Sequence, residues 1–244
     1  MSDRFPIHFA PAERKGNAQI IRENQHIQAM PYLEELLNAF PMPAVILNEY
    51  REIVAANQRF CEFLNREQDE ILGRRPGEAL DCIHWQEGHC GCGTSRFCET
   101  CGAAQAILRS QRQNGEETQE CAITGRTDEG EKVLNLRVTA SSFHLEGKLT
   151  LFSFNDISEE KRRSLRERMF YHSVLNTAAG VRSLLETLPE LSDQCRHETT
   201  RLAYELADYL MEEIEGGKDL AAEREEPAVQ VTPLDVREVL KTVC

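Results

Sequence analysis

The sequence changes pattern at Ser158, and this change constrains the fold more than any other feature. Before Ser158, short apolar runs alternate with polar residues and are separated by Gly, Pro and Asn. After it, apolar residues recur at the 3.6-residue spacing of an α-helix over about thirty residues. We therefore expect a mixed α+β domain followed by an all-helical unit.

The first part contains five strand-like runs and several helical ones. Residues 44–47 and 52–55 predict two strands joined by a turn, and residues 101–115 predict the longest helix of this part. Three further runs, "TQECAITGR", "KVLNLRVTAS" and "KLTLFSFNDI", follow with turn residues between them. This order predicts a five-stranded antiparallel sheet with flanking helices.

The second part predicts two long helices. Its apolar pattern continues to a break at Pro189, and a second helix follows that we expect to end at Gly216–Gly217. A single antiparallel hairpin of two helices cannot bury its own apolar stripe well. We therefore expect a homodimer in which two hairpins form a four-helix bundle.

The abrupt end at Cys244 leads us to expect a piece of a longer protein. The patterns above divide the chain into several predicted segments. The predicted segments are a flexible N-terminal arm over 1–28, the α+β domain over 29–157 with a cysteine-rich insertion at 82–101, a linker helix over 158–169, a helical hairpin over 170–216, and a linker over 217–244 that leads into the start of a truncated domain.

Composition limits the partners and the compartment. The formal net charge of -13 argues against nucleic acid and against an anionic membrane surface as partners. The sequence contains neither the apolar stretch of about 20 residues that a membrane-spanning helix needs nor the apolar core of a signal peptide. We therefore expect a cytoplasmic protein whose nine cysteines are mostly reduced and serve metal binding or redox chemistry.

Five of these cysteines lie within the insertion, in "CIHWQEGHCGCGTSRFCETC". Cys98 and Cys101 form a Cys-x2-Cys pair, a spacing that lets two sulfur atoms bind one metal ion. The glycines of the insertion suit a backbone that wraps around a site and points N–H groups at sulfur. Cys101 also begins a predicted helix, whose dipole favours a thiolate. The insertion predicts a metal site, with a disulfide-based redox switch or free reduced cysteines as alternatives.

The identity of the metal and its ligands are open at this point. Zinc sites favour two Cys-x2-Cys pairs and only one is present, whereas iron–sulfur clusters accept uneven spacing, so we prefer an iron–sulfur cluster to zinc. Cys90 and Cys92 are close neighbours, and we expect one of them to be spare. The preferred ligands are Cys82, Cys92, Cys98 and Cys101, with Cys90 possible, and His84 and His89 as further candidates.

Two aromatic residues of the insertion and the remaining cysteines are expected to have structural roles. Trp85 and Phe97 are expected to shield the site from water or simply to belong to the core. The remaining cysteines are expected to be structural, namely Cys61, Cys121, Cys195 and Cys244.

Two stretches of the first part, "PAVILNEYREIVAANQRFCEFL" and "LFSFNDISEEKR", resemble the PAS family of sensor domains. In that family a sheet strand often ends in an Asp-Ile-(Ser/Thr) tripeptide that opens an output helix, and Asp156-Ile157-Ser158 is similar. The resemblance covers about half of the chain and implies a PAS-like sensor domain that carries the cysteine-rich insertion.

His172 lies outside the apolar stripe of its predicted helix. At about 100° per residue, Phe170, Val181 and Leu185 project almost opposite to the imidazole, and Asn176 follows one turn later beside it. This spacing predicts an exposed imidazole next to a carboxamide. A neutral imidazole is a competent nucleophile near pH 7 and can accept a phosphoryl group.

The sequence "MFYHSVLNTAAGVRSLLE" resembles the phosphoacceptor segment of bacterial sensor histidine kinases. The resemblance implies that His172 is phosphorylated, that Asn176 is the position associated with phosphatase activity, and that a response regulator receives the phosphoryl group. Ser173 departs from the family, which usually has Asp or Glu there as a general base. A hydroxyl is a poor base at neutral pH, so we expect slow autophosphorylation or help from another group.

The tail from Val229 resembles the lead-in to the ATP-binding domain of the same kinases, but none of that domain's motifs is in the sequence. We therefore expect ATP and Mg²⁺ to act only through an ATP-binding domain of the full-length kinase. In this interpretation the cysteine site is the input and His172 is the output. The alternative is a non-catalytic, zinc-stabilised, ligand-binding PAS module on a dimeric helical stalk, and a PAS pocket for a small organic ligand also stays open.

Overall fold

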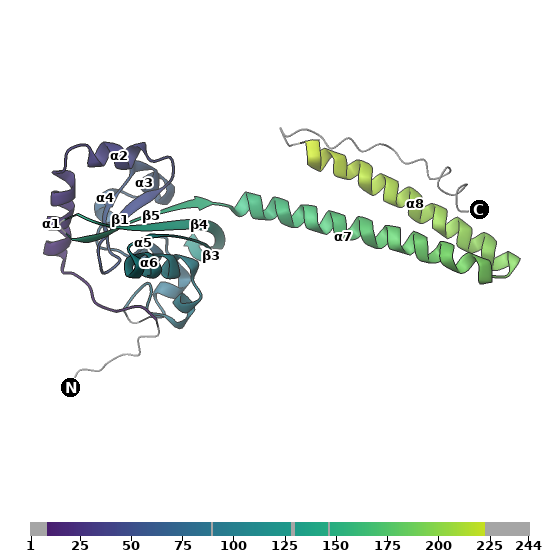
Figure 1. The fold of residues 1–244 in the computed structure, drawn as a ribbon, viewed down its shortest axis with the longest axis horizontal. Coiled ribbons are helices and arrows are strands. Elements are labelled where there is room, and N and C mark those ends of the chain that lie inside the picture. Colours follow the sequence, from purple (N-terminus) through teal and green to yellow (C-terminus); the bar gives the residue numbers. More distant parts are fainter. Residues whose placement is uncertain (1–8, 89, 128–129, 146, 223–244) are drawn as a thin grey trace. The chain divides into compact units, whose positions relative to one another are not determined.

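The computed structural model describes residues 9–88, 90–127, 130–145 and 147–222. The chain divides into two compact units, one up to Lys161 and one from Arg162. The first unit contains a sheet with flanking helices, and the second contains two long helices (Figure 1). The boundary lies in the first turn of α7 (Ser158–Thr187), close to the change of pattern in the sequence.

The first unit is built on a five-stranded antiparallel sheet with the strand order β2-β1-β5-β4-β3 (Figure 1). The first strand pairs with the last, so the N-terminal hairpin and the three C-terminal strands form one sheet. The predicted five-stranded antiparallel sheet with flanking helices is therefore confirmed. The strands are β1 (Ala44–Leu47), β2 (Ile53–Ala56), β3 (Glu116–Thr127), β4 (Gly130–His144) and β5 (Lys148–Asp156).

All four residues of β1 are buried. Successive side chains of a strand point to opposite faces of its sheet, so both faces of β1 are covered. Val45 and Leu47 join a core formed with the helices between β2 and β3. Ala44 and Ile46 join a second core formed with the two N-terminal helices. The helices between β2 and β3 are α3 (Gln58–Leu64), α4 (Gln68–Ile71), α5 (Pro76–Ala79) and α6 (Gly102–Gln113).

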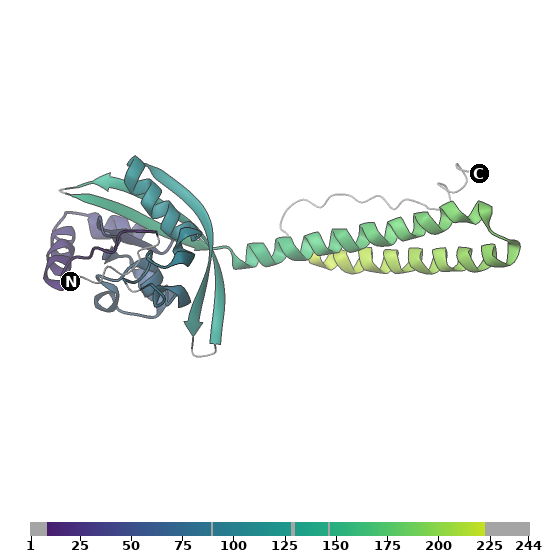
Figure 2. The same ribbon diagram turned by 90° about the horizontal axis from the view of Figure 1, so that it is seen from below.

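Helix α6 packs on the sheet against β3, β4 and β5 (Figure 2). Its apolar residues recur at helical spacing, and Ala103, Ala106 and Ile107 are buried in the first core. The helix ends at Asn114, which adopts φ 51°, a left-handed conformation that Asn tolerates and that commonly closes a helix. This packing fixes the N-terminus of α6, and with it Cys101, against the sheet.

The cysteine-rich insertion lies between α5 and α6 and has little regular structure. It contains only the short 3₁₀ turns η1 (Ile83–Trp85) and η2 (Arg96–Glu99) among its described residues. Gly91 and Gly93 have φ values of 84° and 93°, which residues with a Cβ rarely adopt. These glycines let the chain turn back on itself between the two 3₁₀ turns.

The expectation of a flexible arm over 1–28 is wrong for Asn17–Gln28, and residues 1–8 lie outside the described residues. Asn17–Gln28 forms helix α1, whose Ile20 and Ile27 are buried in the second core. Asn24, on the same face, donates a hydrogen bond to the Val54 carbonyl of β2 at 2.8 Å. The sequence of this helix is mostly polar and therefore did not predict it. Three residues at helical spacing, Ile20, Asn24 and Ile27, are enough to dock it on the sheet. Helix α2 (Leu33–Ala39) follows and ends before Pro41.

The second unit consists of α7 and α8 (Asp193–Ala222), which run antiparallel and side by side in Figures 1 and 2. The predicted break at Pro189 is confirmed as the short turn η3 (Leu188–Glu190). The predicted end at Gly216–Gly217 is wrong, since the helix continues to Ala222. Glycine disfavours a helix by only about 1 kcal/mol per residue, which a long helix tolerates. No helix in the described ranges is long and apolar enough to cross a membrane.

Candidate functional site

Five cysteine side chains line one cavity of about 260 Å³ in the first unit. The cavity lies between β3 of the sheet and the segments from α5 to the start of α6. Four of the thiols are the preferred ligands predicted from the sequence, and the fifth comes from β3. This thiol cavity is defined by Cys82, Cys92, Cys98, Cys101 and Cys121.

Cys82 and Cys92 both lie close to Gly77 of α5. Cys82 precedes η1, and its backbone forms an isolated β-bridge with Gly125 of β3. A Cβ on Gly77 would lie 2.6 Å from the Cys92 sulfur and 3.7 Å from the Cys82 Cβ, so only glycine leaves room there. Burial raises the pKa of both thiols above the ordinary value. The Cys82 and Cys92 thiols are therefore neutral near pH 7.

Cys98 is buried in η2 and its sulfur accepts a hydrogen bond from the Gly93 N–H at 3.2 Å. Burial raises the pKa of the Cys98 thiol, while the N–H groups of Gly93 and Ser95 act in the opposite direction. This contact supports the expectation that the glycine-rich backbone points N–H groups at sulfur.

Cys101 and Cys121 form a thiol pair. The Cys121 thiol donates a hydrogen bond to the Cys101 sulfur, which lowers the pKa of Cys101 and raises that of Cys121. Cys101 is the N-cap of α6, and the N–H groups of Ala103 and Ala104 lower its pKa further. Cys101 is therefore the thiol of the cavity that most readily becomes a thiolate.

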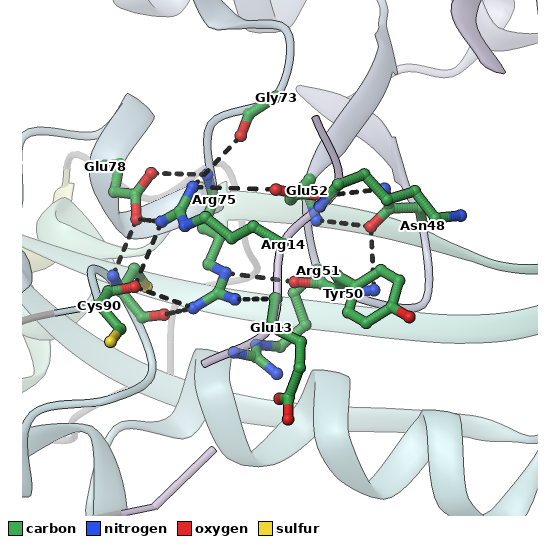
Figure 3. A network of polar contacts seen from close by, with 12 residues as sticks. Glu13, Arg14, Asn48, Tyr50, Arg51, Glu52, Gly73, Arg75, Glu78 and Cys90 are labelled. Carbon is green, nitrogen blue, oxygen red and sulfur yellow. Dashed lines mark hydrogen bonds and ion pairs between the residues drawn. The ribbon is translucent and has the colours of Figure 1, made fainter. Parts of the chain in front are cut away.

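Cys90 lies outside the thiol cavity. Its side chain borders a separate shallow hollow with Arg14, Glu78 and Trp85. Its backbone carbonyl accepts hydrogen bonds from Arg75 at 3.3 Å and from Arg14 at 3.4 Å (Figure 3). The structure therefore brings Cys92, and not Cys90, together with the other candidate ligands.

The other predicted residues around the cavity are placed as follows. His84, Trp85 and Phe97 all line it, and the His84 ring stacks on Phe97 with ring centroids 4.2 Å apart. His89 lies outside the described residues. Within the described ranges, no three Cys, His, Asp or Glu side chains converge as a ready-made ligand set for a single metal ion.

The sequence did not predict Cys121 as a residue of the site, and Cys121 was expected to be structural. Cys121 and Ile123 are buried on β3, while Ala122 between them is exposed, so the period of two places both on the core face. That alternation is the signal that Cys121 points inward. Only the packing of α6 on β3 brings it next to Cys101.

Arg75 is a fully buried cation in the wall of the cavity, at 0% exposure. Burial and the neighbouring Arg51 and Arg14 lower the pKa of its guanidinium to about 10, so it stays charged near pH 7. Its donors satisfy backbone carbonyls from three separate segments (Figure 3). These acceptors are Tyr50 in the β1–β2 turn, Cys90 and Cys92 in the insertion, and Pro11, Ala12 and Glu13 near the N-terminus.

Residues 10–15, called here the N-terminal strap, lie across the insertion. The Ala10 N–H donates to the Gly93 carbonyl at 2.9 Å, and Arg14 forms an ion pair with Glu78 (Figure 3). Glu78 also accepts a hydrogen bond from the Cys92 N–H at 2.9 Å. The strap, α5 and the cysteine-rich insertion are therefore one connected polar network.

The second candidate site lies on α7 in the second unit. The His172 and Asn176 side chains are exposed, and Asn176 Nδ2 lies 3.1 Å from His172 Nδ1. Phe170, Val181 and Leu185 are less exposed, as their position on the opposite stripe predicts. A shallow hollow surrounds the imidazole and contains no carboxylate among its lining residues, which are Leu165, Arg168, Met169, Ser173, Asn176 and Thr177.

Residues 41–159 match the PAS domain family. The match covers all five strands and ends in the first turn of α7. The PAS fold expected from the sequence is therefore confirmed for this segment. No curated protein shows a significant match to the chain.

Several solved PAS domains are similar to this chain. The PAS domain of an HTR-like protein from Haloarcula marismortui is 23% identical, with a TM-score of 0.36, over 56% of this chain and 98% of that one. The PAS domain of BvgS from Bordetella pertussis is 12% identical, with a TM-score of 0.39, over 57% and 94%. The PAS domain of nitrogen regulation protein NR(II) from Vibrio parahaemolyticus is 15% identical, with a TM-score of 0.36, over 52% and 100%.

Proposed function

We propose that this chain is the cytoplasmic sensor portion of a two-component histidine kinase. A metal or redox centre at the thiol cavity controls phosphorylation of His172, and the phosphoryl group passes to a response regulator. The observation that carries the proposal is the continuity of the PAS domain with α7, the helix on which His172 and Asn176 form their exposed pair. ATP acts through an ATP-binding domain elsewhere in the full-length kinase.

The junction between β5 and α7 supports transmission of a signal. The Ser158 N–H donates to the Asp156 carboxylate at 2.8 Å, and the Asn135 N–H of β4 donates to the Ser158 hydroxyl at 3.0 Å. Ile157 between them is buried, and its N–H donates to the Asn135 carbonyl. The Asp-Ile-Ser tripeptide thus ties the start of α7 to the sheet, and a shift of β4 would move the helix.

A second connection runs from the thiol cavity itself. Glu120 precedes Cys121 on β3, and its carboxylate pairs with Lys161 of α7 at 2.5 Å. Arg137 of β4 pairs with both Glu120 and Glu160 at 3.4 and 3.1 Å. These pairs are exposed and individually weak. They nevertheless link the strand that carries a cavity thiol to the first turn of the output helix.

At the output, His172 is the phosphoacceptor and Asn176 orients water for the reverse hydrolysis. The neutral imidazole attacks through one ring nitrogen while the other lies beside the Asn176 amide. The apolar residues that surround His172 on α7, including Met169 and Leu175, are exposed within the described chain. We assign them to contacts within a homodimeric four-helix bundle and with protein partners.

The kinase assignment is tested in the full-length protein with labelled ATP. Label that is stable in base and labile in acid is expected on His172, and His172→Ala should abolish it. His197→Ala is the matched control, because His197 is also exposed on a helix of the second unit. Persistence of the label in His172→Ala would overturn the assignment.

The centre at the thiol cavity is proposed to be an iron–sulfur cluster or zinc, bound by Cys82, Cys92, Cys98 and Cys101. Cys92→Ala should remove the bound metal, measured by elemental analysis of the anaerobically purified protein. Cys90→Ala is the matched control and should keep it, because the Cys90 side chain lies outside the cavity. Equal loss in both variants would contradict this ligand set.

Ser173 favours one alternative, a non-catalytic zinc-stabilised PAS module on a dimeric stalk. The family resemblance places an acidic general base at this position, and the hollow around His172 contains none among its lining residues. Absence of any label on His172 in the full-length protein, together with stoichiometric zinc, would establish this alternative.

A further inference from the structure

Arg51 is a second buried cation, and it lies in the wall of the thiol cavity. Its side chain is held by the N-terminal strap, where Nη2 donates to the Pro11 carbonyl at 2.6 Å. Arg51 is only 4% exposed and adopts φ 66°, a conformation that costs free energy in a residue other than glycine. The surrounding structure therefore maintains this guanidinium in its place.

Arg51, Cys92 and Cys98 line the same cavity, so the guanidinium lies close to thiols. Negative charge on Cys92 and Cys98 would stabilise the charged guanidinium. Gly93 makes the approach possible, because a Cβ there would lie 3.3 Å from Arg51 Nη2. A buried cation needs a negative partner to offset the cost of its desolvation. Neutral thiols do not supply that charge, whereas metal-bound thiolates do.

The size of the cavity bears on what the thiolates bind. A single zinc ion lies about 2.3 Å from each of four sulfur atoms, which must then approach one another to about 4 Å. Among the described residues no three candidate ligands converge on one ion, and the cavity that the thiols line has a volume of about 260 Å³. One water molecule occupies about 30 Å³ of liquid, so the cavity has room for several heavy atoms. An inorganic cluster of iron and sulfide fits such a space.

We infer that the thiol cavity takes an iron–sulfur cluster held by Cys82, Cys92, Cys98 and Cys101, and that Arg51 is the positioning residue that offsets its negative charge. The inference rests on the proposed sensor function and names the cofactor class of the same site. Four thiolates carry more negative charge than the oxidised core carries positive charge, so the assembled cluster is an anion. The Gly93 N–H on the Cys98 sulfur further stabilises that charge.

Arg51 then raises the reduction potential of the cluster. Reduction adds one electron to a site that is already negative, and a nearby cation stabilises the reduced form more than the oxidised form. Arg75 affects the reduction potential less directly, because its N–H groups donate to backbone carbonyls.

The cofactor class is tested on the full chain, purified and kept without oxygen. Iron and acid-labile sulfide in about equal amounts, with broad visible absorption, are expected. A colourless protein that contains zinc, or a protein that contains no metal after reconstitution with iron and sulfide, overturns the inference.

The role of Arg51 is tested by a mediated redox titration of the cluster. Arg51→Gln and Arg51→Met should both shift the midpoint potential to more negative values, while Arg51→Lys should stay closer to the parent. Arg112→Gln, at an exposed arginine of α6, is the matched control and should not shift it. Unchanged potentials in the folded neutral variants overturn the role of Arg51. If neither neutral variant folds, a folded Arg51→Lys that binds no iron overturns it.

These measurements separate the inference from the kinase proposal. His172→Ala should leave iron, sulfide and midpoint potential unchanged, because the imidazole lies in the other unit. An intact cluster without label on His172 would overturn only the kinase proposal. A labelled His172 in a zinc protein would overturn only the cluster.

Discussion

The thiol cavity and the face of α7 around His172 differ in how their residues are brought together. The cavity collects side chains from a loop, a 3₁₀ turn, a helix N-terminus and a strand. His172 and Asn176 lie four residues apart on one helix, and the helix alone places their nitrogen atoms 3.1 Å apart. Two of the cavity cysteines, Cys98 and Cys121, are buried and the other three are half-buried, whereas the imidazole is exposed.

This difference separates what each region requires of the fold. The cavity depends on the buried network of Arg75, Glu78 and the N-terminal strap, so changes there should affect folding as well as function. The His172 face depends only on an intact helix, so changes there should affect chemistry without affecting stability. The following predictions test this contrast, from the largest expected effect to the smallest.

Arg75→Met should cause the largest loss of stability. The change removes a buried cation and leaves backbone carbonyls of the strap, turn and insertion without a donor. We expect the free energy of unfolding of the first unit to fall by about 3–5 kcal/mol. Denaturant unfolding measures it, with the exposed Arg112→Met as a control that changes little. A loss below about 1 kcal/mol would show that the network is dispensable.

Under the proposed kinase function, Ser173→Glu should accelerate autophosphorylation of the full-length protein by about 10²-fold, because it supplies a general base beside His172. The rate of label incorporation from ATP measures this effect. Ser183→Glu, an exposed serine of the same helix, is the matched control and should leave the rate unchanged. Both variants should keep the parent's unfolding midpoint. An unchanged rate in Ser173→Glu would argue for another base.

Gly77→Ala should destabilise the first unit by about 1–3 kcal/mol through overpacking against the Cys92 sulfur, only 2.6 Å from the added Cβ. Metal content should fall in parallel, because Cys92 must move. Gly115→Ala has nothing within 4 Å of its added Cβ and serves as the control. Equal stability of the two variants, by denaturant unfolding, would contradict a tightly packed cavity wall.

Lys161→Gln should have the smallest effect. Lys161 and Arg137 hold the pKa of the Glu120 carboxyl below its ordinary value, so the substitution should raise that pKa. Glu120 is exposed, so the unfolding midpoint should not change near neutral pH. Because the native pKa is depressed, the Glu120 carboxylate stays ionised within the ordinary carboxyl range, and its ion pairs are lost only as the pH falls through the lowered native pKa. An NMR titration of Glu120 in Lys161→Gln measures this pKa, with Lys132→Gln as the control. An unchanged Glu120 pKa in Lys161→Gln would contradict the pairing.

Much of the fold follows from patterns that are local in sequence. The alternating runs predict five strands, and the stripe on α7 predicts which residues turn away from His172. The N-terminal helix α1 was not predicted, because its polar residues outnumber the few that dock on the sheet. The end of α8 was misjudged, because a glycine pair weakens a helix without necessarily ending it.

The candidate sites divide along the same line. Cysteine spacing left Cys90 and Cys92 equivalent, and only the path of the insertion, set by Arg75 and Glu78, turns the Cys92 side chain toward the other thiols. Arg51 carries no sequence signal of a role at the cavity, because an arginine in a turn is ordinarily a solvated charge.

The sequence by itself determined the five strands, the two long helices, their order, and the His172–Asn176 pair, because helix and strand periodicities depend on neighbouring residues alone. The tertiary structure decided which thiols share a cavity, that Cys121 is among them, and that two buried arginines line the same cavity. Those arrangements join segments that are far apart in the chain. They arise only when α6 and the N-terminal strap pack on the sheet and the insertion and desolvate the charges and thiols between them.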